Sequence, residues 1–179
     1  MGEQLVKGTG IIPVREYIKE KFGDETLKKI LNRMPKEYQE YFENLFDVQW
    51  YPLEILSTLY TLITEEIGKG DPKVCWEVGR YTAEYGLNKI YKFFLRLGSI
   101  KLFVNKGHAM YSTYYKGSEL KILKYEENYI EIQIIGIKTS DSHLYSIGGW
   151  MEKAGELVGA KNVKVEIDIK DVIYKIHYD

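Results

Sequence analysis

The sequence predicts an α+β fold in which a helical N-terminal half packs on a four-stranded antiparallel sheet in the C-terminal half. Apolar residues recur at helical spacing over most of residues 11–116, whereas the period changes to two beyond them. One further helical stretch divides the later segments, which gives the order β-β-α-β-β. Because alternating strands bury one face only, the helices are expected to cover that face of the sheet.

A single domain is expected to span residues 1–179, since this length fits one ordinary domain. Residues 1–10 contain three glycines and are expected to form a flexible arm. Residues 11–116 are then mainly helical, and residues 117–179 form the sheet with one helix.

Glycines and prolines divide the helical half. A helix is expected over residues 14–30, but Gly23-Asp24 interrupts it, and a second helix is expected over 25–32. Further helices are expected over 37–46, 53–67 and 73–97. Trp50-Tyr51-Pro52 is expected to be a turn. The long segment 73–97 carries Gly79 and Gly86 on one face, where each glycine costs up to about 1 kcal/mol, so close approach of another backbone is expected there.

The segment from residue 100 to 115 is open to two interpretations, a helix that ends near Tyr115 or a helix that turns into a strand. Beyond it, alternation predicts two hairpins and one helix. The hairpin strands are 119–125 with 129–137 and 163–169 with 172–178, and the helix is 141–158.

Composition excludes several classes of function. The net charge of −1 gives no basic footprint for nucleic acid. No apolar run approaches the length of a membrane span, and no targeting segment is recognisable, so a cytoplasmic location is expected. Cys75 is the one cysteine, which forbids an internal disulfide and any zinc site with several cysteines.

The sequence offers no recognisable catalytic or metal motif. The histidines are His108, His143 and His177, and no two of them have metal-ligand spacing on one helix. His143 lies in a Ser-Asp-Ser-His stretch that a helix N-terminus explains, and His177 is expected at the surface. An enzymatic interpretation rests on Cys75 and His108 alone, so we expect no catalytic residues and no metal.

Tyrosine is the unusual feature of the composition, with 16 residues. Tyrosine combines apolar area with a hydroxyl that needs a partner, so ordinary packing in the core and at its rim explains many of them. The alternative is an aromatic pocket between the long helix, residues 100–115 and the sheet. Its expected lining residues are Tyr81, Tyr85, His108, Tyr111 and Tyr115.

Three stretches, in order along the chain, resemble haem nitric-oxide-binding domains. The first consists of Gly10-Ile11-Ile12, Tyr17-Ile18 and residues 21–31. The second is the segment Glu77-Val78-Gly79-Arg80-Tyr81, and the third is residues 148–160 followed by Val163-Lys164-Val165-Glu166. The same fold group contains 4-vinyl reductase-type domains and TRAPP-type trafficking subunits. A myxobacterial family of unknown function has a similar closing helix with a Gly-Trp pair.

The departures from this family concern haem. Its haem-binding members carry a histidine on a helix upstream of a Tyr-x-Ser-x-Arg motif. Here Tyr111-Ser112-Thr113-Tyr114-Tyr115 falls at the motif, Tyr115 stands where the arginine would hold the haem propionates, and no histidine lies between residues 1 and 107. The resemblance therefore implies a haem-free relative without a cofactor.

We expect a non-catalytic sensory module that binds a small apolar or aromatic molecule. The alternative is a protein interaction or assembly module like the trafficking subunits, with a homodimer or another protein as partner. That alternative predicts an exposed apolar face, for which residues 53–67 are the candidate.

Overall fold

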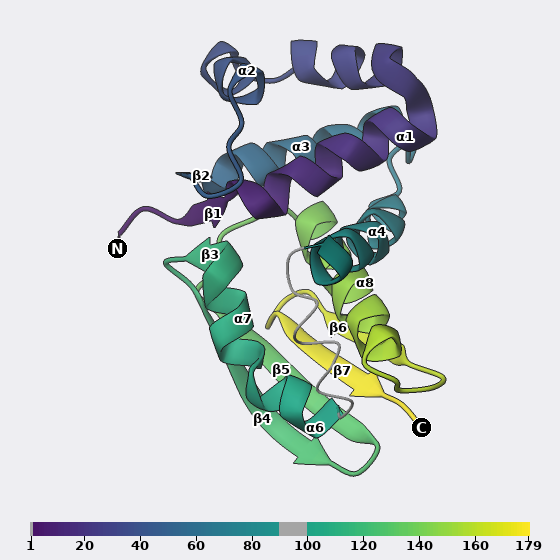
Figure 1. Ribbon diagram of the computed structural model, residues 1–179. Helices are drawn as coiled ribbons and strands as arrows, with labels where there is room; N and C mark the ends of the chain where they lie inside the picture. The colour runs from purple at the N-terminus through teal and green to yellow at the C-terminus, as the bar shows by residue number, and fades with distance from the viewer. Residues whose placement is uncertain (1, 90–99) are drawn as a thin grey trace.

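The computed structural model describes residues 2–89 and 100–179, and it confirms the predicted α+β fold. In Figure 1 the helices of the N-terminal half lie at the top and the larger sheet lies at the bottom, with α4 and α8 between them. The second half follows the predicted β-β-α-β-β order.

The N-terminal half contains α1 (Gly8–Asn32), α2 (Lys36–Glu43), α3 (Leu53–Glu66) and α4 (Val74–Lys89). The expected break in the first helix is confirmed, because α1 kinks at Gly23, where φ is 83° and an L side chain would be strained. The expected continuation of α4 to residue 97 lies outside the described residues.

The segment before the sheet follows the second of its two interpretations. It forms α6 (Ile100–Asn105) and α7 (Gly107–Tyr114), and the chain then becomes extended in β3 (Tyr115–Lys116). Figure 1 shows α6 and α7 lying over strands of the larger sheet.

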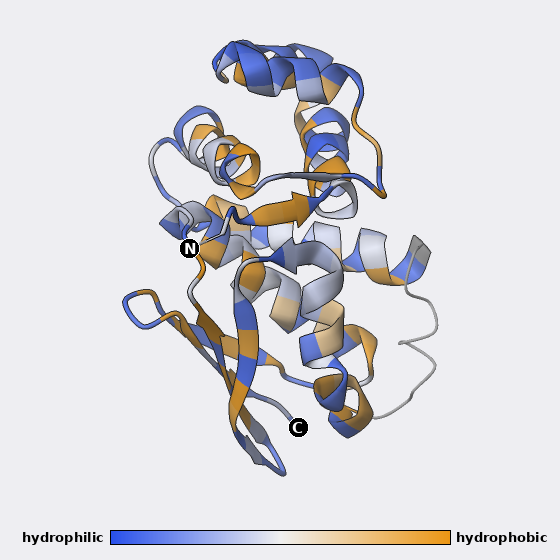
Figure 2. Ribbon diagram, turned by 90° about the vertical axis from the view of Figure 1, so that its left-hand side faces the viewer, coloured by the Kyte–Doolittle hydropathy of each residue, from blue (hydrophilic) through white to orange (hydrophobic). Residues whose placement is uncertain are grey.

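The larger sheet is antiparallel, with the order β4-β5-β7-β6. Its strands are β4 (Glu119–Glu126), β5 (Tyr129–Ile135), β6 (Lys164–Asp168) and β7 (Ile173–His177). Register pairs Ile130 with Ile176 and Ile132 with Tyr174, so one face collects buried apolar residues. Figure 2 shows this alternation as orange and blue bands along the strands.

Residues 1–10 do not form the flexible arm that was expected. Leu5–Lys7 is strand β1 at the centre of a three-stranded sheet with the order β2-β1-β3. Val6 pairs with Tyr51 and Tyr115 and is fully buried, which holds the segment despite its glycines. The turn expected at Trp50–Pro52 is likewise wrong, because these residues form β2.

Helices α4 and α8 (Asp141–Leu157) pack at their glycines. A Cβ added to Gly79 would lie 1.8 Å from the backbone oxygen of Ser146, and one added to Gly149 would lie 2.0 Å from that of Trp76. The backbone approach expected at Gly79 is thus confirmed. At Gly86 the added atom would instead meet the hydroxyl of Tyr114 at 2.8 Å.

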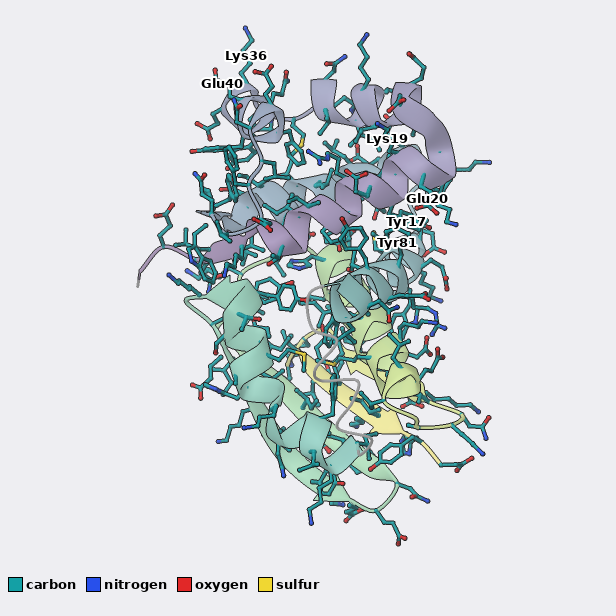
Figure 3. All side chains as sticks on the ribbon, in the orientation of Figure 1. Tyr17, Lys19, Glu20, Lys36, Glu40 and Tyr81 are labelled. Atoms are coloured by element: carbon teal, nitrogen blue, oxygen red, sulfur yellow. The ribbon has the colours of Figure 1, made fainter. Side chains whose placement is uncertain are left out.

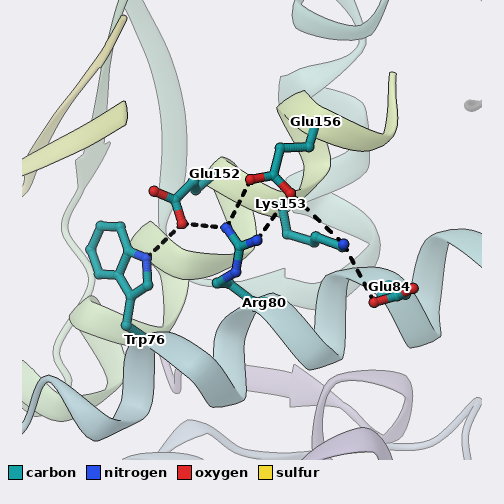
Figure 4. Close-up of polar contacts among 6 residues, drawn as sticks. All are labelled: Trp76, Arg80, Glu84, Glu152, Lys153 and Glu156. Atoms are coloured by element: carbon teal, nitrogen blue, oxygen red, sulfur yellow. Dashed lines mark hydrogen bonds and ion pairs between the residues drawn. The ribbon is translucent and has the colours of Figure 1, made fainter. Parts of the chain in front are cut away.

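A polar network fastens the outer side of this helix pair (Figure 4). The guanidinium of Arg80 on α4 donates to both carboxylate oxygens of Glu156 at 3.0 and 3.1 Å, and it also donates to Glu152. Trp76 Nε1 donates to Glu152 at 2.9 Å, and Lys153 lies 3.5 Å from Glu84. The charged partners are half-buried or exposed, and the network links α4 to α8 beside their glycine contacts.

The exposed apolar face expected on residues 53–67 is not present. The apolar side chains of α3 are buried in the core, because the helix packs on both α1 and α8. In the described part of the chain the most exposed large apolar residues are Phe46 and Val48, in the loop before β2. None of the described helices is long and apolar enough to cross a membrane.

Candidate functional site

A cavity of about 120 Å³ lies between α7, α8 and the apolar face of the larger sheet. Helices α4 and α6 contribute to its wall, and the first turn of α1 contributes Thr9 and Gly10. The cavity therefore joins the helical half of the chain to the sheet half. It lies among the elements between which a pocket was expected.

Aromatic rings make up one side of the cavity. Tyr111 and Tyr115 stack with ring centroids 4.8 Å apart, and Tyr114 meets Trp150 edge-on at 6.2 Å. Phe103 stacks on Trp150 with ring centroids 6.5 Å apart. These rings come from α6, α7, β3 and α8. Short apolar segments of the sequence place these elements against the sheet.

Aliphatic side chains of the sheet and of α8 form the opposite side. The buried residues Ile130 and Ile132 of β5 and Ile176 of β7 face the cavity together with Ile147 of α8. They share this face because strand side chains alternate between the two sides of a sheet. The described wall contains no Asp, Glu, Lys, Arg or His side chain.

The hydroxyls of three lining tyrosines are bonded to neighbours. Tyr60 accepts from Ser146 at 2.6 Å, Tyr111 lies 2.7 Å from the hydroxyl of Ser118, and Tyr115 lies 3.0 Å from a ring nitrogen of His143. Burial raises the pKa of Tyr60, Tyr111 and Tyr115, so these groups are neutral. The aromatic wall is therefore uncharged as well as apolar.

His143 contacts two tyrosines of the cavity wall, Tyr115 and Tyr60. Its Nε2 faces the Tyr115 hydroxyl, its Nδ1 lies 2.7 Å from Thr139 Oγ1, and its ring stacks on Tyr60 at 5.1 Å. Burial lowers the pKa of His143 to about 3. Sequence reasoning explained this residue by a helix cap, and Ser140 does cap α8, but His143 also shares a helical face with Ile147, four residues on.

The five residues predicted from sequence divide into two groups. Tyr111 and Tyr115 line the cavity. Tyr81 lies outside it, between α4 and α1, where its ring meets Tyr17 at 5.2 Å and its hydroxyl donates to Glu20 (Figure 3).

The other two predicted residues also lie away from the cavity. Tyr85 borders a surface depression with Phe46 and residues of α1. His108 is exposed on α7, and its Nε2 lies 3.8 Å from a Glu119 carboxylate oxygen. Helical spacing could not separate the face of α7 that carries Tyr111 from the face that carries His108 without knowing where the sheet lies.

Sequence reasoning missed several lining residues, of which Thr9 is the most informative. Thr9 is 7% exposed, and its hydroxyl is buried without a hydrogen-bond partner among the described residues. The sequence did contain a signal for Trp150. This residue directly follows Gly148 and Gly149, and paired glycines in a helix indicate that another helix approaches closely. No signal could have identified Thr9, because the segment was expected to be an arm.

Cys75 and His108, on which an enzymatic interpretation rested, do not share a site. Cys75 is buried between α3 and α4, 3.4 Å from Thr64 Oγ1, and burial raises the pKa of its thiol to about 11. A thiol with this pKa forms little thiolate at neutral pH, which makes it a poor nucleophile. Within residues 2–89 and 100–179, no cluster of three His, Cys, Asp or Glu side chains could hold a metal ion.

Comparison with solved structures shows the fold of H-NOX domains. A variant H-NOX protein of K. algicida in its unliganded Fe(II) state gives a TM-score of 0.69 at 14% identity, covering 97% of this chain and 96% of its own. The H-NOX from Shewanella woodyi in its Fe(II)CO state gives 0.67 at 15%, covering 96% and 94%. An oxygen-binding H-NOX domain related to soluble guanylate cyclases gives 0.60 at 13%, covering 97% and 95%.

The haem nitric-oxide-binding resemblance is thus confirmed at the level of the fold. No protein-family model matches the sequence, and a sequence search of curated proteins finds no match. At these identities the likeness shows how the chain folds, and the ligand must be argued from the residues of this chain.

The residues of the cavity do not fit a haem group. Haem iron is held by histidine, cysteine, tyrosine or a methionine with histidine. His108 and His177 are exposed, both ring nitrogens of His143 face hydroxyls, and Cys75 is not part of the wall. The three bonded tyrosines would have to lose protons that burial makes them retain.

The haem propionates and the haem ring fit this cavity no better than the haem iron does. Tyr115, which the sequence resemblance places at the arginine expected to hold the propionates, has its hydroxyl engaged by His143. Burying an uncompensated carboxylate in such an uncharged wall carries a large cost. The volume of about 120 Å³ also falls short of the roughly 300–1,000 Å³ of common cofactor and drug sites.

Proposed function

We propose that this chain is a haem-free, non-catalytic sensory module that binds a small neutral molecule in the cavity between α7, α8 and the larger sheet. The observation that supports it is a cavity of about 120 Å³ whose described wall is aromatic and aliphatic and carries no charge. The H-NOX fold adds support, since solved proteins of this fold include an oxygen-binding domain.

Size and chemistry define the class of ligand. A dry apolar cavity of about 150 Å³ in another protein accepts benzene, so a cavity near this volume admits molecules of about one ring. Apolar contact with the aromatic and aliphatic walls would supply the affinity. Charged molecules are disfavoured, because no described lining residue offers an opposite charge.

The haem-free part of the proposal is supported by the hydrogen bonds of His143 and by Tyr115 at the expected arginine position. Its non-catalytic part is supported by the separation of Cys75 from His108, which leaves no nucleophile beside a base in the described site.

Calorimetric melting in buffer saturated with toluene tests this function. A ligand that binds the folded chain alone raises its melting temperature in proportion to RT ln(1 + [L]/Kd). We expect an increase for the wild type and none for Ile132→Phe, which fills the cavity from β5. Ile135→Phe is the matched control, because Ile135 lies on the same strand but is exposed.

The proposal is overturned if toluene leaves the wild-type melting temperature unchanged. It is equally overturned if Ile132→Phe retains the full increase, because the molecule would then bind elsewhere. An increase in the wild type and in Ile135→Phe, absent from Ile132→Phe, supports it.

A further inference from the structure

The hydroxyl of Thr9 is a buried polar group of a residue that lines the cavity. Thr9 is the second residue of α1, and its side chain is more than nine-tenths buried. Its backbone N–H donates to the carbonyl oxygen of Asp47 at 3.0 Å, but its Oγ1 has no hydrogen-bond partner among the described residues. Because Thr9 belongs to the cavity wall, its side chain borders a space that a ligand can enter.

Buried hydroxyls are nearly always bonded, since leaving one unpaired costs free energy. Two other hydroxyls of the wall, those of Thr82 and Ser146, follow this rule. Thr82 Oγ1 donates to the carbonyl of Gly79 at 2.9 Å, and Ser146 donates to Tyr60 at 2.6 Å. Thr9 therefore differs from Thr82 and Ser146, and a ligand atom is a partner that would satisfy its hydroxyl.

The surroundings of Thr9 restrict what that ligand can be. At the next residue, a Cβ added to Gly10 would lie 3.5 Å from Cδ1 of Tyr114, so an aromatic ring packs against the backbone beside Thr9. The described wall is uncharged, and a threonine hydroxyl can either donate or accept one bond. A neutral ring with a single polar atom fits both conditions.

We propose that the ligand is a neutral molecule of about one aromatic ring that carries a single hydrogen-bonding atom, of the chemical class of phenol, and that Thr9 Oγ1 binds this atom. This inference rests on the proposed function, because it names the ligand class of the same cavity. It adds a specificity-determining residue that lies on α1, whereas most of the wall belongs to the C-terminal half.

Titration calorimetry with phenol and toluene tests the inference on the full chain. The readout is the ratio of the toluene Kd to the phenol Kd. In Thr9→Val, which keeps the shape and removes the hydroxyl, we expect this ratio to fall about tenfold, the effect of one hydrogen bond. In Thr9→Ser it should stay within about threefold of the wild-type value.

Thr82→Val is the matched control, because it makes the same change in the same wall at a hydroxyl that already has a partner. Its ratio should equal that of the wild type. A second readout needs no variant: wild-type phenol should bind at least as tightly as toluene, although its hydroxyl must first leave water.

The outcomes separate the two proposals. If neither probe binds the wild-type chain, the cavity function and the inference are both overturned. If toluene binds but the ratio is unchanged in Thr9→Val, or if toluene binds the wild type more than about tenfold tighter than phenol, the inference alone is overturned. A fall of the ratio in Thr9→Val, with none in Thr82→Val, supports it.

Discussion

The side-chain hydroxyl of Tyr115 lies 3.0 Å from Nε2 of His143, so the first turn of α8 holds a residue of the cavity wall directly. A neutral imidazole has one donor and one acceptor nitrogen, and hydroxyls can take either role. Tyr115 and Thr139 can therefore satisfy the ring together while it remains uncharged. This pair keeps the wall uncharged, and burial lowers the pKa of His143.

Acid should destabilise the fold through His143. Burial lowers its pKa to about 3, whereas an unfolded histidine titrates near 6.5. Between these values the unfolded chain binds more protons than the folded chain, so the free energy of unfolding falls as the pH falls. The contribution of His143 is fully present above about pH 6.5, and its loss should approach about 1.4 kcal/mol per pH unit below that.

Urea denaturation between about pH 7 and pH 4 measures this loss as the difference between the wild type and His143→Gln, which cannot titrate. The control is His177→Gln, which removes an exposed histidine and should retain the wild-type profile. Equal pH dependence in the wild type and His143→Gln would show that another group is responsible.

Thr9→Val should stabilise the ligand-free chain. The substitution removes a buried hydroxyl that has no partner in the described structure and retains the volume of the side chain. Relief of that unmet hydrogen bond is expected to raise the free energy of unfolding by about 1 kcal/mol. Denaturation midpoints measure it, with Thr82→Val expected to lose stability. A destabilised Thr9→Val would mean that the hydroxyl is already bonded.

Gly79→Ala should break the contact between α4 and α8. The new Cβ would lie 1.8 Å from the backbone oxygen of Ser146, which a side-chain movement cannot relieve. We expect a loss of about 3 kcal/mol or more, at the upper end of overpacking costs. Guanidinium denaturation measures the loss, and Gly2→Ala, which meets no atom within 4 Å, should be neutral. Near-wild-type stability for Gly79→Ala would contradict this helix packing.

Arg80→Met should cost about 1–2 kcal/mol of stability, because the guanidinium makes bidentate, partly buried contacts with Glu156. Arg33→Met is the comparison, since Arg33 pairs with Glu65 and Glu66 in a more exposed place and should lose less. Urea midpoints of the two variants decide the matter. A larger loss for Arg33→Met would show that burial does not set the strength of these pairs.

The pattern of apolar residues predicted the fold because each element buries one face. The change of period near residue 117 marks the start of the sheet, and Gly23 marks the kink in α1. Residues 1–10 were misjudged for a physical reason: glycines permit disorder, but strand pairing of Val6 with Tyr51 and Tyr115 is a long-range contact that no local pattern contains.

The site was predictable only where local sequence and tertiary position coincide. Tyr111 and Tyr115 line the cavity because they stand at the end of a helix that leads directly into the sheet. Tyr81 was chosen for the same reason, the unusual number of tyrosines, but its ring faces α1. The interest of Thr9 lies in a single hydroxyl without a hydrogen-bond partner among the described residues, a feature that exists only in the folded chain.

Methyl NMR of the isoleucine-labelled chain, titrated with toluene, tests the central claim most directly. We predict saturable shifts at four buried isoleucines of the cavity wall: Ile130, Ile132, Ile147 and Ile176. Ile55 and Ile63, which are buried in the separate core of the helical half, should not move. The absence of shifts at the four wall residues up to the solubility of toluene, or shifts confined to exposed Ile135, would contradict a ligand-binding cavity.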